Sequence, residues 1–173
     1  KDRQLEKRLA EALEQQTATS EILRVIRRSP TDAQPVFDMI AERAMRLCGA
    51  LHGGVLRFDG ELIHVGSFVY FSPEFSESLR RLYPRPPGPG TAGARAILTR
   101  ETVHIPDLER EPEYEFTEGA RAAGFRSALA VPMLWDGQAI GAIVVFGGES
   151  VPFSERHVQL LQTFADQAVI AVE

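Results

Sequence analysis

The stretch from Arg126 to Gly147 constrains the fold of this 173-residue chain more than any other. It holds two apolar arms, Ser127–Trp135 and Gln138–Phe146, joined by Asp136-Gly137. Asp-Gly is a preferred pair for a tight hairpin turn, because glycine accepts a positive φ without a Cβ clash. Both faces of both arms are apolar, whereas a half-exposed hairpin would alternate with polar residues. The stretch therefore predicts a hairpin at the centre of an antiparallel sheet, with both faces of that sheet covered.

Two helices are predicted before the sheet. Residues 1–28 contain no glycine or proline, and their apolar residues follow the heptad spacing of a coiled coil. A helix of this length would span about 40 Å, so we expect a parallel dimer helix, with a solvated helix lying on its own domain as the alternative. After Ser29-Pro30, a second helix is predicted from Ala33 to Cys48, ended by Gly49. The expected dimer contacts of the first helix are Leu5, Leu9, Ala12, Leu23 and Ile26, with Gln16 and Thr19 as polar interruptions.

A second hairpin and an irregular insertion follow. The hairpin arms, Gly53–Asp59 and Glu61–Tyr70, carry polar residues and are predicted nearer the sheet edge. About fifty residues then hold only short elements, and insertions of this length are usually functional or mobile. We expect them to cover a pocket on one face of the sheet. The elements predicted within them are helices at Pro73–Tyr83 and Ala92–Arg100, a strand at Thr102–Ile105, a helical turn at Thr117–Ala123, and loops over residues 84–90 and 106–116.

A long helix is predicted from about Glu155 to beyond Glu173. Ser154 is a good N-cap, and His157 stands at the position where a capping box would place a glutamate. The apolar stripe of this helix is broad, so we expect it both to pack on the sheet and to pair with a second subunit. The residues predicted for that pairing are Leu161, Phe164 and Ala168.

The amino-acid composition of the chain excludes several classes of function. The net charge of -5 gives no basic surface for nucleic acid or an anionic membrane. No apolar run approaches the ~20 residues of a membrane span. The single cysteine, Cys48, excludes an internal disulfide and a zinc cluster, and favours a reducing, cytoplasmic setting. Both ends of the chain fall inside helical patterns, so we expect it to be part of a longer protein.

The order helix, helix, hairpin, insertion, hairpin, long helix resembles a GAF domain, the small-molecule sensor module of bacterial signalling proteins. The resemblance rests on AERAMRLCGALHGGVLRFDGE at 41–61, TVHIPDL at 102–108, and the two stretches 124–147 and 152–173. It is similar above all to GAF domains of sensor histidine kinases and related receptors. It implies an α+β fold with a central antiparallel sheet of five to six strands, the terminal helices on one face and a ligand cavity over the other. Residues 29–173 would form the GAF domain and residues 1–28 a signalling helix.

The chain offers little for catalysis. It has no G-x-S-x-G motif and no glycine-rich phosphate loop, so we expect no enzyme activity. Among GAF-like proteins, free methionine sulfoxide reductases use several cysteines, and bilin-binding domains use one in the cavity region, which Cys48 does not match. Cyclic-nucleotide-binding GAF domains carry an Asn-Lys pair where this chain has Gly147-Gly148. Haem binding remains an alternative, with His64 and His104 as candidate ligands.

The predicted ligand cavity has mostly apolar walls, which suit a small apolar or aromatic ligand. The polar candidates are Thr91, Asp107, Arg126 and Ser127. The alternative is that the aromatic residues fill a core, that Asp107 caps a turn, and that Arg126 pairs with nearby glutamates. The predicted walls are Phe68, Tyr70, Phe75, Leu79, Tyr83, Ile97, Val103, Ile105, Tyr114, Phe116, Phe125 and Leu129.

The leading hypothesis is a non-catalytic sensory domain of a two-component signalling protein, most simply a histidine kinase. It would bind an unidentified small molecule without a cofactor, form a parallel homodimer, and relay ligand occupancy through its helices to an output domain in the same chain. It would contact neither nucleic acid nor membrane. The alternatives are a ligand-free structural dimerisation module and a haem-based sensor.

Overall fold

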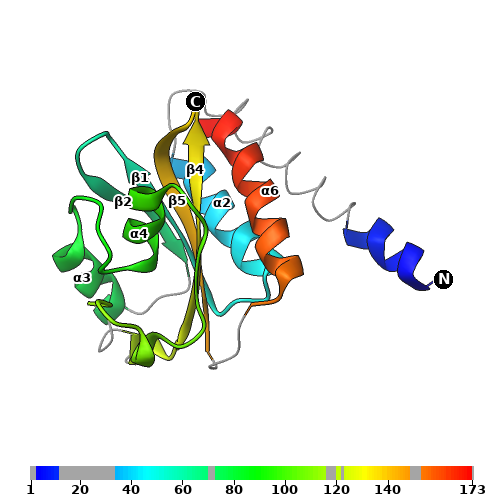
Figure 1. The fold of residues 1–173 in the computed structure, drawn as a ribbon, viewed down its shortest axis with the longest axis horizontal. Coiled ribbons are helices and arrows are strands. Elements are labelled where there is room, and N and C mark those ends of the chain that lie inside the picture. The colour runs from blue at the N-terminus through cyan, green and yellow to red at the C-terminus, as the bar shows by residue number, and fades with distance from the viewer. Residues whose placement is uncertain are drawn as a thin grey trace.

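The computed structural model describes residues 3–11, 34–69, 73–115, 120–121, 123–148 and 153–172, with the backbone alone at 73–76, 171 and 172. The described chain forms three layers (Figure 1). Helices α2 (Gln34–Leu47) and α6 (Glu155–Val172) cover one face of a central sheet. Helices α3 (Pro73–Leu82) and α4 (Ala92–Thr99) lie on the opposite face. The α+β architecture predicted for the chain is confirmed.

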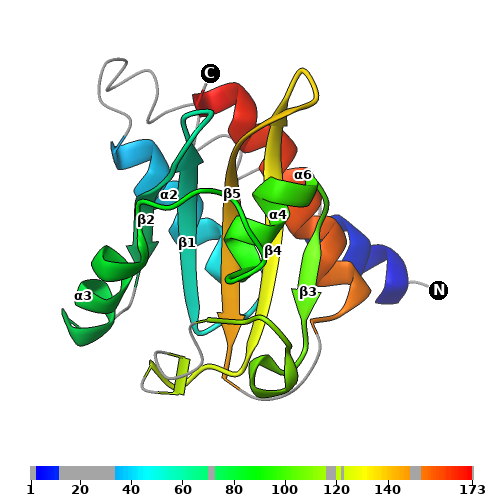
Figure 2. The ribbon, with the colours of Figure 1, turned by 60° about the vertical axis from the view of Figure 1, so that its left-hand side comes forward.

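The sheet has five antiparallel strands in the order β2-β1-β5-β4-β3 (Figure 2). The predicted central hairpin is confirmed: β5 lies in the middle and β4 beside it, joined by a turn in which Asp136 and Gly137 both have positive φ. The prediction that the other hairpin lies nearer the edge is confirmed for β2, which is an edge strand, whereas β1 lies inside the sheet and pairs with both β2 and β5. The strands are β1 (His52–Phe58), β2 (Ile63–Val69), β3 (Val103–Ile105), β4 (Ser127–Trp135) and β5 (Gln138–Gly147).

The two faces of the hairpin enter two separate cores. Leu129, Val131 and Met133 pack with the helices α2 and α6, whereas Ala128 and Ala130 pack with the opposite layer. Simple alternation breaks near the turn, where the β4–β5 register shifts between Met133 and Leu134. Because of this irregularity, Ile140 packs against the helix-side core, although alternation from Ala142 would place it on the other face.

Helix α2 lies close against the sheet. Its predicted stripe is buried, and Gly49, which follows the helix, has a positive φ as expected of a helix-ending glycine. Gly53 makes the close approach possible: a Cβ there would lie 2.6 Å from the carbonyl oxygen of Ala41. The buried stripe comprises Val36, Phe37, Ile40, Ala41, Ala44 and Leu47.

Local capping interactions define the short helices on the opposite face of the sheet. The Thr91 hydroxyl accepts the N–H of Ala94 and begins α4, and Arg100 ends it in the left-handed conformation. A short 3₁₀ helix, Leu108–Arg110, lies inside the segment predicted as a plain loop. The Asp107 side chain begins this turn by accepting the N–H of Glu109.

The apolar residues predicted for dimerisation fall in two different environments. Leu161, Phe164 and Ala168 are 0% exposed within a single subunit, because they face the chain's own sheet, so their assignment to a subunit interface was wrong. Leu5 and Leu9, in the helical segment 3–11, are 63% and 62% exposed. Ala12, Gln16, Thr19, Leu23 and Ile26 lie outside the described residues. None of the described helices is long and apolar enough to cross a membrane.

Candidate ligand pocket

A small pocket lies between the sheet and the layer of α3 and α4. Its floor comes from β1, β2 and β5, and its cover from α3, the start of α4 and Tyr114. The cavity volume is about 20 Å³, roughly the space of one water molecule. Its walls are almost entirely apolar, and they are formed by Leu56, Phe68, Leu79, Leu82, Tyr83, Thr91, Ala92, Gly93, Tyr114, Val144 and Phe146.

The polar groups of the pocket form one hydrogen-bonded pair. The Tyr83 hydroxyl lies 3.0 Å from Thr91 Oγ1, and this oxygen also accepts the N–H of Ala94 at 3.1 Å. Burial raises the pKa of the Tyr83 phenol, and it raises the pKa of the Tyr114 phenol as well. Both phenols are therefore neutral near pH 7, and no described residue lining the pocket carries a charge. The arrangement favours an uncharged occupant with one hydrogen-bonding group.

We expect Thr91→Val to lower the free energy of unfolding by about 2 kcal/mol. The change removes the N-cap of α4 and leaves the buried Tyr83 hydroxyl and the Ala94 N–H without their shared partner. Urea unfolding followed by circular dichroism measures the loss. Thr91→Ser keeps the oxygen and serves as the control; a loss as large as that of the valine variant would contradict this role of the hydroxyl.

Ion pairs fasten the cover around the pocket. Arg95 pairs with Glu111 at 2.6 Å, and its guanidinium also donates to the carbonyl of Pro89 at 2.8 Å. Arg85 pairs with Glu115, whose backbone N–H donates to the carbonyl of Gly90 at 2.8 Å. The acidic segment 106–115 is thus tied to α4 and to the proline-rich loop. Partly exposed ion pairs of this kind are weak singly. The backbone of Arg85 also pairs with Ile63 of β2, which joins the proline-rich loop to the sheet.

The structure brings together five of the predicted site residues: Phe68, Leu79, Tyr83, Thr91 and Tyr114 all line the pocket. Ile97, Val103, Ile105 and Phe125 pack in the core on the same face but outside the lining. Leu129 packs on the opposite face, with the helices. Tyr70, Phe116 and the side chain of Phe75 lie outside the described residues. The residues missed by sequence reasoning are Leu56, Leu82, Ala92, Gly93, Val144 and Phe146.

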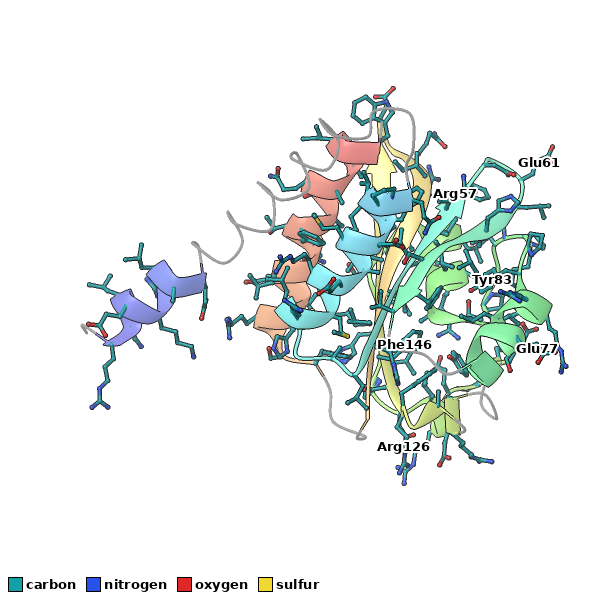
Figure 3. The ribbon with its side chains drawn as sticks, turned by 180° about the vertical axis from the view of Figure 1, so that it is seen from behind. Arg57, Glu61, Glu77, Tyr83, Arg126 and Phe146 are labelled. Carbon is teal, nitrogen blue, oxygen red and sulfur yellow. The ribbon has the colours of Figure 1, made fainter. Side chains whose placement is uncertain are left out.

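The three other polar candidates lie away from the pocket. Arg126 is at the lower end of the molecule, apart from Tyr83 and Phe146 (Figure 3). Its guanidinium pairs with Asp107 at 3.1 Å, and the same carboxylate group begins the 3₁₀ helix. Ser127 is buried on the helix side, where it borders a second, more open hollow between the end of α2 and the start of α6. These three residues do not line the pocket. Asp107 and Arg126 are engaged in local capping and pairing, and strand alternation directs Ser127 to the other face.

Comparison with known proteins identifies the fold. The family model of the GAF domain matches residues 30–173. The chain belongs to the GAF domain family. None of the curated proteins compared with the chain matches it.

Solved structures agree on the fold of this GAF domain at low sequence identity. The GAF domain of a phosphoenolpyruvate-protein phosphotransferase from Coxiella burnetii is 15% identical, with a TM-score of 0.73 over 93% of this chain and 94% of that one. A domain assigned to a two-component sensor histidine kinase of Sinorhizobium meliloti 1021 is 12% identical, with a TM-score of 0.66 over 82% and 91%. Free methionine-R-sulfoxide reductase from Neisseria meningitidis is 19% identical, with a TM-score of 0.68 over 94% and 89%.

The histidines proposed for haem do not face the pocket of this GAF domain. His64 Nε2 lies 2.8 Å from the carboxylate of Asp59 at an exposed turn. His104 lies opposite Leu129, which belongs to the helix-side core, and its Nε2 accepts the N–H of Phe153 at 2.9 Å. Within the described part of the chain, no group of three or more histidine, cysteine, aspartate or glutamate side chains is placed to hold a metal ion.

Cys48 is also remote from the pocket of the GAF domain. It is buried at the end of α2 in the helix-side core, and burial raises the pKa of its thiol to about 12. The thiolate is the reactive form of cysteine. Near neutral pH the side chain is therefore an inert thiol that fills the core.

Proposed function

We propose that this GAF domain is a cytoplasmic sensory domain of a signalling protein, most simply a histidine kinase. It binds a small, uncharged and mostly apolar molecule in the pocket between the sheet and α4. Ligand occupancy is relayed through the helices at its two ends, which pair with those of a second subunit. The observation that carries the proposal is the pocket itself: apolar walls and a single buried hydroxyl pair beneath a cover of short helices.

Ligand entry requires the cover to move. A volume of about 20 Å³ is too small for a metabolite. The cover consists of α3, the start of α4 and Tyr114, and it is fastened by Arg85–Glu115 and Arg95–Glu111. An occupant that reaches the Tyr83–Thr91 pair would displace Leu79 and Leu82 outward. The Arg85–Glu115 and Arg95–Glu111 ion pairs would then differ between the closed and the ligand-occupied state.

Strand β5 supplies a physical route from the pocket to the helices. Val144 and Phe146 line the pocket, while Ile143 and Val145, alternating with them, pack in the helix-side core with α2 and α6. A shift of β5 caused by the ligand therefore changes the packing of α6 directly. The exposed Leu5 and Leu9 support pairing of the N-terminal helical segment with a second copy.

The cysteine and the side chains that line the pocket support a regulatory role rather than a catalytic one. The similar Neisseria protein is a reductase, but in this chain the single thiol is buried, protonated and outside the pocket. None of the described residues lining the pocket is ionised at neutral pH. A binding role is therefore the simpler proposal.

Indole tests the pocket as an uncharged aromatic probe. Thermal unfolding at ten times the dissociation constant should show stabilisation of about 1.4 kcal/mol. Ala92→Val fills the pocket and should abolish the shift, whereas Leu98→Val, on the exposed side of the same helix, should keep it. Equal shifts in both variants would place the indole elsewhere and contradict the proposed site.

The second candidate is a ligand-free structural dimerisation module. The cavity volume of about 20 Å³ favours it, since a core of this kind is nearly filled by its own side chains. Under this alternative, neither indole nor a mixture of cell metabolites would change the unfolding temperature.

A further inference from the structure

Two histidines hold the beginning of α6, on the face of the sheet opposite the pocket. His104 Nε2 accepts the N–H of Phe153 at 2.9 Å, and His157 Nδ1 accepts the N–H of Ser154 at 3.4 Å. The Phe153 ring lies between them, with ring centroids 5.9 Å from that of His104 and 6.2 Å from that of His157. Two consecutive backbone N–H groups at the entry of the helix are thus each paired with an imidazole nitrogen.

The second of these bonds completes a capping box of unusual chemistry. The Ser154 hydroxyl accepts the N–H of His157 at 3.1 Å, and the His157 ring accepts the N–H of Ser154 in return. A glutamate or glutamine normally makes the return bond. A glutamate acceptor stays ionised well below pH 6, whereas an imidazole loses its lone pair on protonation in the range just below neutrality. The residue at this position therefore makes the cap sensitive to mild acid.

We propose that His104 and His157 form an acid-sensitive clamp on the start of α6. As neutral rings they accept the Phe153 and Ser154 N–H groups. Protonation converts each acceptor nitrogen into a donor, so each bond is lost as its ring is protonated, and the first turn of α6 is released when both are lost. This regulation does not depend on ligand binding and goes beyond the proposed sensory function.

The surroundings of the clamp favour the neutral rings near pH 7. Burial lowers the pKa of His104. Burial, and then the charge of Arg156, lower the pKa of His157. The other charged and titratable groups identified around the start of α6 are Glu155 in its first turn, Glu11, which pairs with Arg156 at 2.9 Å, and the Cys48 thiol, which lies 3.8 Å from the carbonyl oxygen of His157.

The lowered pKa values of His104 and His157 determine how the stability of the domain changes with pH. Because both pKa values are lower in the folded state, the unfolded chain binds more protons as the pH falls through the usual range of histidine. The stability supplied by the clamp is complete above about pH 6.5, and it is lost progressively as the pH falls below that value. The Arg156–Glu11 pair would pass the release of α6 to the helical segment 3–11.

Long-range ¹H–¹⁵N spectra of the unmodified chain test the clamp directly. At pH 7.5 we expect unprotonated His104 Nε2 and unprotonated His157 Nδ1, and both rings should titrate below pH 6.5. Amide exchange at Phe153 and Ser154, corrected for its intrinsic pH dependence, should lose at least tenfold protection between pH 7.5 and 5.5. A proton on either acceptor nitrogen at pH 7.5, or an unchanged protection factor, would overturn the proposal.

Variants separate the clamp from the general effects of acid. The double variant His104→Gln, His157→Glu supplies acceptors that do not titrate in this range, so its protection at Phe153 and Ser154 should be the same at both pH values. His64→Gln changes a histidine on β2 that pairs with Asp59, and it should retain the wild-type pH dependence. Should the double variant still lose tenfold protection, other groups cause the change and the clamp is refuted. The spectra of the unmodified chain decide the matter even where a variant fails to fold.

Discussion

Phe164→Ala is expected to lower the free energy of unfolding by about 3–5 kcal/mol. Phe164 is completely buried between α6 and the sheet, in the core that also holds α2. Truncation removes the apolar surface that the ring buries and leaves a cavity that a well-packed layer cannot close. Urea unfolding monitored by circular dichroism at several protein concentrations measures the effect.

The concentration series distinguishes a core residue from an interface residue. If Phe164 packs within its own subunit, the loss is the same at every protein concentration, and the oligomeric state is unchanged. Ile170, 62% exposed on the same helix, provides the control, and its change to alanine should alter stability by less than about 0.5 kcal/mol. If the Phe164→Ala variant is nearly as stable as the wild type but no longer associates, Phe164 lies at the subunit interface instead.

Gly141→Ala is expected to cost about 3 kcal/mol or more. A Cβ at this position would lie 2.2 Å from the carbonyl oxygen of Leu56 and 2.8 Å from the end of the Met133 side chain. The side chain could move, but the carbonyl belongs to β1, the strand paired with β5 at this point. The central strands must separate or the local register must change, and both weaken the two cores at once. Chemical denaturation again gives the magnitude.

Gly88→Ala is the matched control for this substitution. No atom lies within 4 Å of a Cβ built on Gly88, and its φ is not positive. Alanine there should leave stability unchanged or raise it slightly, because it restricts the unfolded chain. Similar losses at the two positions would mean that the contact between β5 and β1 is not what requires glycine at position 141.

The parts of the fold that were predictable are those in which local signals agree. The Asp136-Gly137 turn and the unbroken apolar arms fixed the limits of β4 and nearly those of β5. The other Asp-Gly pair was less informative: β1 ends at Phe58, β2 begins at Ile63, and the Asp59 side chain organises a longer turn by accepting the N–H groups of Glu61 and Leu62. β1 lies inside the sheet because it pairs with β5, which is distant in the sequence. The local residue pattern of β1 does not predict this pairing.

Apart from Phe68 on β2, the pocket was predictable only on the side of its cover. Tyr83, Thr91 and Tyr114 stand out in the inserted segment because they are aromatic or polar residues among loops. Val144 and Phe146 were missed because both faces of β5 are apolar, and only the packing of α4 decides which face borders the pocket. Gly93 was missed for another reason: a Cβ there would lie 2.3 Å from the Leu56 side chain, a contact that brings α4 close to the sheet and is not visible in the sequence.

Burial also explains the error at α6. The broad apolar stripe of this helix suggested two partners, but its sheet and α2 already cover Leu161, Phe164 and Ala168. The residues available to a second subunit are those left exposed, Leu5 and Leu9 among them. The expected parallel dimer therefore depends on the N-terminal helical segment more than on the stripe of α6.

Native mass spectrometry of the purified chain, compared with its mass after denaturation, tests the sensory proposal most directly. We expect a dimer that carries a small molecule released on denaturation, and a Leu9→Lys variant that retains the small molecule but dissociates into monomers. Chains without added mass, both as purified and after incubation with a metabolite extract, would contradict ligand sensing. Wild-type chains that remain monomeric would contradict the relay through paired helices.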